Sequence, residues 1–383
     1  MKNIASNALT FLIVGLIALG GVIGYGQNAF YAPGPLERPV CLQVNRGASV
    51  EAIGQSLQEL GALENPTIFR IGARYTGKGE DRRFGNFLLP ANVSMDEALD
   101  IVTAGGQSTC GAEVNFRIGV TRFDILAREL DPASGDYVEV ARWEPGVDEQ
   151  PEAFEALRDE DPDLRYRVTV AEGTTSWQVR EGLNAVPWLE GEIAEVPAEG
   201  TLAPDSYEFR VGDDRAGIIA QMEERQARLL ADAWENRQPG LPLDSAEQLL
   251  TLASIVEKET SLPSERGTVA AVFINRLNRD MPLQTDPTVI YGITNGEGVL
   301  GRGLRRSELD RATPYNTYQI QGLPPGPIAN PGRDAIAAAA NPVDSEFIFF
   351  VADGTGGHAF AVTYEEHQQN VARWREIEAE RAE

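Results

Sequence analysis

The sequence predicts an α+β protein with a single N-terminal transmembrane helix, small α/β modules and a mixed α+β C-terminal domain. Three observations predict this fold class. The chain opens with an uncharged apolar run, strand-like and helix-like segments then alternate, and the apolar pattern becomes denser from Leu243 onward. With 383 residues and a hydrophobic content of 42%, the chain is long enough for roughly two or three domains with real cores.

The first element is the uncharged run "ALTFLIVGLIALGGVIGY", residues 8–25. About 18 residues at about 1.5 Å each span roughly 27 Å, close to the hydrocarbon thickness of a bilayer. We therefore expect an uncleaved anchor over residues 8–26; the alternative is a signal peptide cleaved near "GYG", residues 24–26. Lys2 predicts that residues 1–7 form a cytoplasmic tip and that the rest of the chain lies outside the cytoplasm.

A Pro-rich linker is expected over residues 27–40, and a small α/β module over residues 41–120. Cys41 and Cys110 lie near the two ends of this module. In an oxidising compartment they could form a disulfide worth up to about 4 kcal/mol, and the alternative is two unpaired thiols. Two cysteines and two histidines are too few and too dispersed for a zinc site, so we expect no metal and no cofactor.

Strands and capped helices alternate within this module. "CLQVNRG", "GNFLLP" and "AEVNFRIGV" are strand-like, whereas "SVEAIGQSLQELGAL" and "SMDEALDIVTAGG" are typical of helices. Ser49 is the expected N-cap of the first helix, and Asn65 followed by Pro66 predicts the start of another. Residues 121–165 are acidic and rich in turn residues, so we expect an exposed insertion or linker there.

Residues 166–242 are expected to form a second α/β subdomain. "VTVAEGTTSWQVREGL" repeats the strand, turn and helix order of "LQVNRGASVEAIGQSL", although only over about ten residues. "EGTLAPDSYEF" predicts a turn and a strand, and "AGIIAQMEERQARLLADAWENR" predicts a long amphipathic helix. The chemical domain is then expected over residues 243–383.

Charge and motifs exclude several classes of function. The formal net charge of −25 would repel a polyanion, so we expect no nucleic-acid partner. Gly296, Gly298 and Gly301 form a G-x-G-x-x-G pattern, but it follows no clear strand and is interpreted as a loop rather than a dinucleotide site. The sequence contains no nucleophile elbow, P-loop or H-E-x-x-H motif.

The strongest chemical candidate lies in "ASIVEKET", at the end of a helix that Asp244 or Ser245 should cap. At 100° per residue, Glu259 lies about 60° from the middle of the apolar face, Glu257 about 100° from it, and Lys258 almost opposite. A carboxyl group turned toward apolar packing resists ionisation, as a general acid near neutral pH must. A helix tip fraying into solvent is an equally weighted alternative. Glu257 is interpreted as a rim or structural carboxylate, and Lys258 as facing solvent.

Further polar residues follow this helix. Glu257 and Glu259 point about 160° apart, so they cannot act on one bond together, and Asp286 is the possible second carboxylate. A turn or helix cap before Pro287 is the favoured interpretation of Asp286. Residues 314–332 concentrate Tyr, Asn and Gln, which suits sugars, although a plain turn-rich loop explains them equally well. "DGTGGHAF" predicts a hairpin, in which His358 could line a cleft.

Five ordered blocks, "LASIVEKET", "VAAVFINRL", "MPLQTDPTVIYG", "TPYNTYQIQGLPPGPIANPG" and "FVADGTGGHAF", resemble those of the MltG-type, YceG-like family of endolytic murein transglycosylases. The resemblance covers about residues 166–374; residues 110–165 do not map onto it, and Ala203 stands where a bulkier apolar residue is expected. It implies a single-pass inner-membrane protein, mostly periplasmic, with a LysM-like α/β module over residues 41–120 and a catalytic domain over residues 243–383.

The resemblance also implies the reaction. Nascent glycan strands of peptidoglycan would be cleaved between MurNAc and GlcNAc to leave 1,6-anhydro-MurNAc ends, with one glutamate as general acid and base. The family's glutamate falls in "EKET", and Glu-Thr resembles the Glu-Ser pair of other lytic transglycosylases, which selects Glu259 over Glu257. The implied role is terminator of glycan polymerisation, with peptidoglycan synthases as further partners. The alternative is a non-catalytic peptidoglycan-binding or divisome scaffold. The substrate-binding candidates are Asn275, Gln284, Thr285, Asp286, Tyr291, Tyr315, Asn316 and Tyr318.

Overall fold

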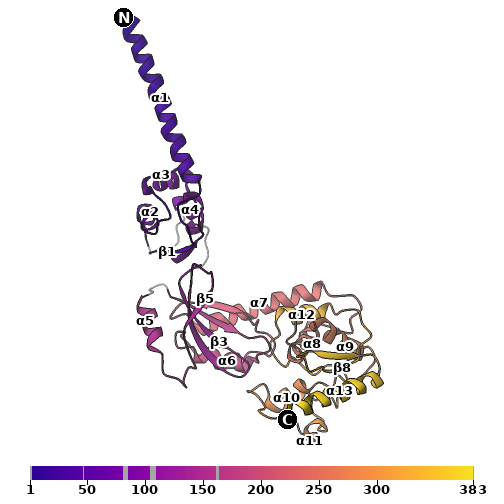
Figure 1. Ribbon diagram of the computed structural model, residues 1–383. Coiled ribbons are helices and arrows are strands. Elements are labelled where there is room, and N and C mark those ends of the chain that lie inside the picture. The colour runs from indigo at the N-terminus through magenta and orange to yellow at the C-terminus, as the bar shows by residue number, and fades with distance from the viewer. Residues whose placement is uncertain (1, 46, 81–84, 104–108, 161–163, 383) are drawn as a thin grey trace. The chain divides into compact units, whose positions relative to one another are not determined.

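The protein is described by a computed structural model that covers residues 2–45, 47–80, 85–103, 109–160 and 164–382 (Figure 1). Helices and strands are mixed along the chain, which confirms the predicted α+β class. The chain divides into two compact units. Unit 1 comprises residues 1–114, 126–142 and 150–165, and unit 2 comprises residues 115–125, 143–149 and 166–383.

Unit 1 begins with the long apolar helix α1 (Lys2–Tyr31). Its portion Ile13–Tyr31 is long and apolar enough to cross a membrane, a property that a signal sequence would share. The helix continues past the predicted end of the anchor at residue 26, so the first part of the predicted linker 27–40 is helical. The reason is tertiary packing, because Phe30 is only 3% exposed and belongs to the core of unit 1.

The rest of this core is a small α/β module. Leu42 lies opposite Phe87 in an antiparallel pair of strands. The predicted N-caps are confirmed, because Ser49 Oγ accepts the Ala52 N–H at 3.1 Å and Asn65 Oδ1 accepts the Thr67 N–H at 3.0 Å. The elements are β1 (Val40–Val44), α2 (Val50–Glu59), α3 (Pro66–Thr76), the short 3₁₀ helix η1 (Lys78–Glu80), β2 (Gly85–Leu89) and α4 (Met95–Thr103).

Cys41 and Cys110 form a disulfide with a Cα–Cα distance of 5.7 Å and a sequence separation of 69 residues. Of the two alternatives open from the sequence, the structure has the paired one. The bond joins Cys41 of β1 to Cys110, two positions before the strand that begins at Ala112, so it closes the module covalently.

The expectation of an exposed insertion over residues 121–165 is wrong. This segment forms two strands and a helix, and the strands belong to a five-stranded sheet of order β5-β4-β3-β6-β7. Buried Ile125, Leu126 and Ala127 outweigh the acidic turn residues, which only connect the strands. The elements are β3 (Ala112–Ile118), β4 (Phe123–Leu130), β5 (Tyr137–Trp143), α5 (Glu152–Glu160), β6 (Arg165–Val170) and β7 (Ser206–Phe209).

Helices are the main type of regular structure in unit 2. The predicted strand, turn and helix after residue 166 are confirmed, with Thr175 and Gln178 forming a capping box. Residues 166–383 belong to one unit, so the predicted boundary between 242 and 243 does not separate two units. The helices are α6 (Ser176–Ala185), α7 (Arg215–Glu235), α8 (Ala246–Glu259), α9 (Arg266–Leu277), α10 (Asp286–Thr294), α11 (Arg306–Leu309), α12 (Arg333–Ala340) and α13 (Tyr364–Ala382).

Helix α8 lies at the centre of this helical part. It packs against α7, α9 and α12, and its buried side chains form the core together with those of α9 (Figure 1). The predicted hairpin is confirmed as β8 (Phe349–Ala352) and β9 (His358–Ala361), which pair antiparallel. The G-x-G-x-x-G pattern of Gly296, Gly298 and Gly301 lies in the loop after α10, as predicted.

Candidate active site

Helix α8 carries Glu259 as its last residue and holds it in a fixed position. Ser245 caps the helix, and its Oγ accepts the Gln248 N–H at 3.3 Å. Leu249, Leu252 and Ala253 are fully buried on the apolar face. Because this face is anchored in the core, the last turn does not fray into solvent. The structure therefore favours the site interpretation of the EKET segment over the frayed tip.

The surroundings of Glu259 make its carboxyl group hard to ionise. Burial is the main cause and raises its pKa, and Asp286 acts in the same direction. A hydrogen bond from Thr285 Oγ1 to Glu259 Oε1 lowers the pKa, as do the charges of His358 and Arg276. The C-terminal end of α8 also disfavours an anion through the helix dipole. Burial thus favours the protonated form of the Glu259 carboxyl group, which is the form that a general acid needs.

Glu259 lines a cavity of about 250 Å³. The prediction that His358 lines a cleft is confirmed, and the cleft is the one that contains Glu259. The residues come from the end of α8, from the β8–β9 hairpin and from α13: Glu259, Thr260, Ser261, Ala352, Gly354, Gly356, Gly357, His358, Trp374 and Arg381.

Glu265 fixes the hairpin that forms one wall of this cavity. Its Oε1 accepts the His358 backbone N–H at 2.9 Å, and its Oε2 lies 2.8 Å from His358 Nδ1. A Cβ at Gly357 would lie 2.5 Å from Glu265 Oε1, so this close approach requires glycine. Nothing in the spacing of the sequence connects Glu265 with His358, and sequence reasoning missed this pair.

Glu257 has a structural environment. Its side chain is 5% exposed, its Oε2 accepts the Gly332 N–H at 2.9 Å, and its Oε1 lies 3.5 Å from the Arg266 guanidinium. Burial raises the pKa of Glu257, and the Gly332 hydrogen bond opposes this shift. Glu257 does not line the Glu259 cavity. It holds α8 to the start of α12, in line with the structural alternative given above.

The expectation that Lys258 faces solvent is wrong. Its Nζ donates a hydrogen bond to the Gly173 carbonyl at 3.1 Å, and burial lowers the pKa of its ammonium group. The loop between β6 and α6 covers this side of α8. Helical periodicity describes only the faces of one helix, so it could not reveal a covering loop that comes from 85 residues earlier in the chain.

Four of the predicted substrate-binding residues lie around the start of α10, next to Glu259. Thr285 is the N-cap residue of α10 and contacts Glu259 directly. The sequence predicts Asp286 as a turn or helix cap before Pro287; the cap lies one position earlier, at Thr285, and Asp286 is the first helical residue. Asp286 accepts a hydrogen bond from the Tyr318 hydroxyl at 2.7 Å. Burial raises the pKa of the Tyr318 phenol. Gln284 is exposed, with a left-handed φ of 47°.

Tyr291 and Tyr315 belong to a second cluster, outside the lining of the Glu259 cavity. Their ring centroids are 4.9 Å apart, and the Tyr291 hydroxyl is hydrogen-bonded to Glu199. Glu199 Oε1 also accepts the Ser176 N–H at 2.9 Å, and burial raises the pKa of this carboxyl. Sequence reasoning missed Glu199, whose only signal is its place in the "EGTLAPDSYEF" turn.

Asn275 and Asn316 are not brought to the site. Asn275 Nδ2 donates to the carbonyls of Ser345 and Phe347 at 2.8 and 2.9 Å. Asn316 is fully buried, and its Nδ2 donates to the carbonyls of Glu308, Leu309 and Arg311. Both amides hold loops in place. An amide that satisfies buried carbonyls cannot be told from a sugar-binding amide by sequence alone.

In the part of the chain that the structure describes, no group of three or more His, Cys, Asp or Glu side chains could hold a metal ion. The lining of the cavity includes the carboxyl group of Glu259, the imidazole of His358, the guanidinium of Arg381 and the hydroxyls of Thr260 and Ser261. A single carboxyl group that is half-buried, hydrogen-bonded and has a raised pKa is suited to transfer a proton to a leaving oxygen and to take one back.

Comparison with known proteins gives a consistent result. The model of the YceG-like family matches residues 143–373. The endolytic murein transglycosylase of Streptococcus pneumoniae serotype 2, strain D39, is 28% identical over 387 residues, which cover 97% of this chain. This chain spans 65% of that protein's length. The endolytic murein transglycosylase of Bacillus subtilis, strain 168, is 28% identical over 359 residues, covering 92% of this chain and 90% of that protein.

Among solved structures, a YceG-like protein from Listeria monocytogenes matches with a TM-score of 0.46 and 24% sequence identity. The match covers 87% of this chain and 99% of the Listeria chain.

Proposed function

This chain belongs to the YceG-like family, and we propose that it is an endolytic murein transglycosylase in which Glu259 is the general acid and base. The names of the streptococcal and Bacillus relatives support the reaction class. The observation that carries the assignment of Glu259 is its position: a half-buried carboxyl group, hydrogen-bonded by Thr285, lining a cavity. The proposed substrate is the nascent glycan strand of peptidoglycan.

The reaction needs one carboxyl group because the sugar supplies its own nucleophile. Protonated Glu259 gives its proton to the glycosidic oxygen between MurNAc and GlcNAc, and the bond from that oxygen to C1 of MurNAc breaks. The C6 hydroxyl of the same MurNAc then bonds to C1, and Glu259 takes the hydroxyl proton. The products are a 1,6-anhydro-MurNAc end and a GlcNAc end. No water is consumed, and Glu259 returns to its protonated form.

Arg276 and His358 lie where a positive charge supports the ionised form of Glu259 between these steps. Arg276 is held by hydrogen bonds from Nε to the Ile348 carbonyl at 2.7 Å and from Nη1 to the Leu283 carbonyl at 2.8 Å. Arg276 and His358 both favour the anion, whereas burial disfavours it. These opposing effects act on the two protonation states that an acid that later acts as a base must adopt. Tyr318, Gln284 and Asp286 are the proposed sugar contacts nearest to it, and Tyr291 and Tyr315 form a proposed stacking surface.

The remaining proposals concern the chain as a whole. Helix α1 anchors it as a single-pass protein of the inner membrane, with the rest of the chain in the periplasm, and the module at 41–120 is LysM-like. The apolar length of α1 and the disulfide of Cys41 with Cys110 support this location, because disulfides persist in oxidising compartments. In this setting, cleavage of nascent strands would terminate glycan polymerisation, and peptidoglycan synthases would be partners.

Digestion of purified glycan strands tests the reaction and the choice of glutamate. Wild-type protein should release fragments with anhydro ends, detected by mass spectrometry. Glu259→Gln should lower the rate by about 10² to 10⁴, the usual contribution of a general acid or base. Glu257→Gln is the matched control from the same helix and should keep the reaction if it folds, which circular dichroism would check.

Each other result has a definite meaning. Reducing ends in place of anhydro ends would show hydrolysis. Loss of activity in folded Glu257→Gln, with activity kept in Glu259→Gln, would transfer the role to Glu257. Wild-type protein without any product would favour the alternative, a peptidoglycan-binding scaffold of the same fold.

A further inference from the structure

Helix α3 carries an apolar stripe, part of which packs against α1 and part of which is exposed to solvent. Ile68, Ile71, Gly72 and Tyr75 lie within about 100° of helical arc, the i, i+3, i+4, i+7 spacing of one face. Gly72 packs directly on the ring of Phe30, leaving no room for a side chain. Ile71 and Tyr75 are 62% and 82% exposed. The face of α3 that contacts α1 therefore continues into two exposed apolar side chains.

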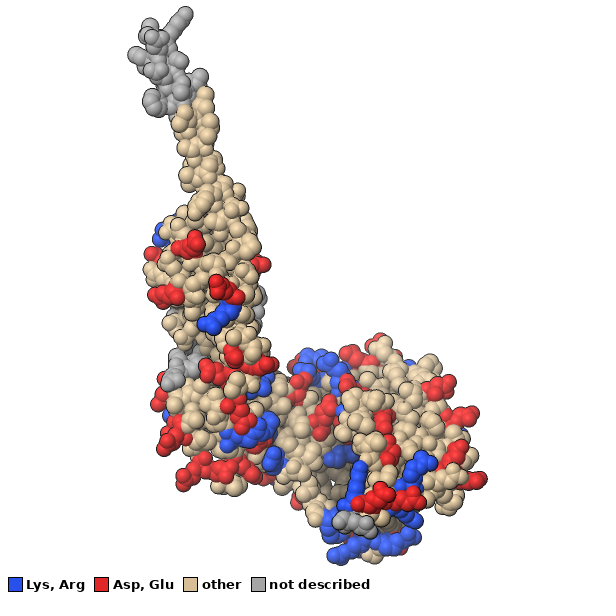
Figure 2. Space-filling model, viewed as in Figure 1, with Lys and Arg blue, Asp and Glu red and all other residues tan. Residues whose placement is uncertain are grey.

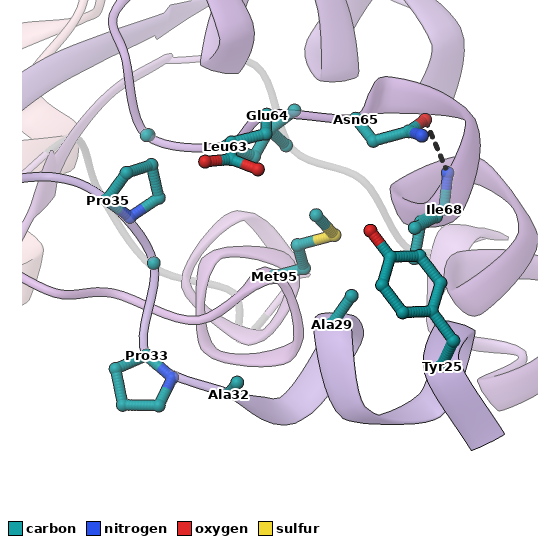
Figure 3. A pocket seen from close by; sticks show the side chains of 12 residues that line it. Tyr25, Ala29, Ala32, Pro33, Pro35, Leu63, Glu64, Asn65, Ile68 and Met95 are labelled. Atoms are coloured by element: carbon teal, nitrogen blue, oxygen red, sulfur yellow. Dashed lines mark hydrogen bonds between the residues drawn. The ribbon is translucent and has the colours of Figure 1, made fainter.

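A pocket of about 300 Å³ lies beside this stripe, between the end of α1 and the segment that leads into α3. Figure 3 shows the Tyr25 ring next to Ile68, with Ala29 of α1 and Met95 at the start of α4 nearby. Most of the lining is apolar, and Glu64 contributes a carboxylate. On the face seen in Figure 2, the uncharged surface of α1 continues onto the adjoining end of unit 1.

The position of the predicted anchor along α1 determines how close this surface lies to the bilayer. The apolar run predicted as the anchor, residues 8–25, ends at Tyr25, and Phe30 follows about 8 Å farther along the helix. The interfacial layer on each side of the hydrocarbon core is about 5–8 Å thick. Phe30 is already in the core of unit 1, so no flexible linker separates the module from the membrane helix. Figure 1 shows α3 at the end of the module from which α1 emerges.

We propose that unit 1 has a membrane-contact surface that enters the lipid interfacial layer of the bilayer crossed by α1; it consists of Tyr25, Tyr31, Ile71 and Tyr75. The inference rests on the proposed anchoring. Tyrosines favour this layer because the ring is apolar and the hydroxyl is polar. Arg74, exposed beside the stripe, suits a lipid phosphate, and Glu64 suits the ammonium group of phosphatidylethanolamine. The occupant is lipid, bound by the module as well as by the helix.

Photo-crosslinking from the full chain tests this inference. Tyr75 is replaced by p-benzoylphenylalanine, and Gln55, exposed on α2, is replaced in the same way as the matched control. The proteins are placed in nanodiscs of phosphatidylethanolamine and phosphatidylglycerol, irradiated and analysed by mass spectrometry. Lipid adducts should be about tenfold more abundant at position 75 than at position 55, because only position 75 lies in the interfacial layer. A variant labelled at Ile71 should match position 75.

Carbonate extraction of native membranes separates the two levels of the proposal. A chain that carbonate releases would overturn the anchoring and this inference with it. A chain that stays in the membrane, with equal adducts at 75 and 55, would overturn the membrane-contact surface alone. Protein adducts at 75 in native membranes, in place of lipid adducts, would also overturn it, since the occupant would then be a partner protein. None of these outcomes depends on glycan cleavage.

Discussion

Glu257 and Glu259 lie two positions apart on one helix, and their surroundings give them different tasks. Both carboxyl groups have a raised pKa because of burial. The carboxylate oxygens of Glu257 contact the Gly332 N–H and the Arg266 guanidinium, whereas Glu259 lines a cavity. A shifted pKa therefore does not identify the acid at this site. Access to the cavity is the property that separates the two residues.

The hydroxyl of Thr285 should tune the pH range of the reaction. It donates to Glu259 and lowers the pKa of this carboxyl, so Thr285→Val should raise that pKa. Glu259 must start protonated, so the alkaline limb of the pH profile of kcat/KM should move to higher pH. Thr285→Ser keeps the hydroxyl and should leave the limb in place. A limb that moves to lower pH in the valine variant would contradict the assigned direction.

The same burial should make Glu259 costly for stability. A carboxyl group with a raised folded pKa binds protons more tightly in the native state, so stability falls as pH rises from the unfolded value of 4.5 toward the folded pKa. Glu259→Gln should therefore have a higher Tm than wild type at about pH 8 and the same Tm at about pH 4. Thermal unfolding at both pH values measures this difference.

Glu247 in the first turn of the same helix is the control. A hydrogen bond from Ser245 lowers the pKa of Glu247, so Glu247→Gln should bring no such gain at the higher pH. A wild-type protein more stable than Glu259→Gln at about pH 8 would show that Glu259 is compensated in the native state.

At the scale of elements, hydrogen bonds between loop segments connect distant parts of unit 2. The turn after β6 and the segment before α12 meet through Asn330, which is fully buried. Its Nδ2 donates to the Thr174 carbonyl at 3.1 Å, and its Oδ1 accepts the Leu202 N–H at 3.0 Å. Its backbone exchanges hydrogen bonds with Gly173 and Thr174. One side chain thus connects three segments that are distant in sequence.

Removing this side chain should destabilise unit 2. Asn330→Ala leaves the buried Leu202 N–H without its partner and leaves the Thr174 carbonyl with only the backbone bond from Asn330, which should lower the free energy of unfolding by about 1–3 kcal/mol. Chemical denaturation measures the loss. Asn278→Ala, at an exposed position after α9, should change stability by less than about 0.5 kcal/mol. Equal losses of stability in the two variants would mean that water replaces the hydrogen bonds made by the Asn330 side chain.

Helices and strands were predictable from the sequence where the local residue pattern and the observed burial agree. Helix caps such as Ser49, Asn65 and Ser245 were correct because the capping bond is made within one turn. The β4 and β5 strands were missed because their acidic turns dominate the composition of that segment. Thr285 contacts Glu259 directly. Asn316, predicted to bind substrate, and Lys258, predicted to face solvent, instead donate hydrogen bonds to backbone carbonyls of other segments, which no periodicity within their own segments describes.

At the scale of the molecule, the two units carry different features. The residues proposed for glycan cleavage all lie in unit 2, whereas the apolar helix, the disulfide and the proposed membrane-contact surface lie in unit 1. The net charge of −25 gives the chain a field that repels anions. Recognition of a glycan is therefore expected to rest on short-range contacts with aromatic rings and polar groups rather than on charge attraction.

Loss of the disulfide should affect unit 1 alone. The Cys41→Ser, Cys110→Ser double variant should lose up to about 4 kcal/mol of stability in unit 1, from the entropy of the opened loop. Hydrogen exchange read separately in the two units measures it, with the core around Phe69 losing protection and the core around Phe273 keeping it. Equal loss in both cores would show that the units unfold as one.

The disulfide also determines how the chain transmits tension. A pull on α1 reaches Cys41, crosses the bond to Cys110 and enters β3 two residues later. The covalent path through the bond bypasses the segment between the cysteines, with its sequence separation of 69, so this segment is loaded only through its packing against α1. Reduction would place this segment in the line of tension and add roughly 240 Å of extensible chain. With the disulfide formed, the covalent path from α1 to β3 passes through Cys41 and Cys110, and the residues between them lie outside that path.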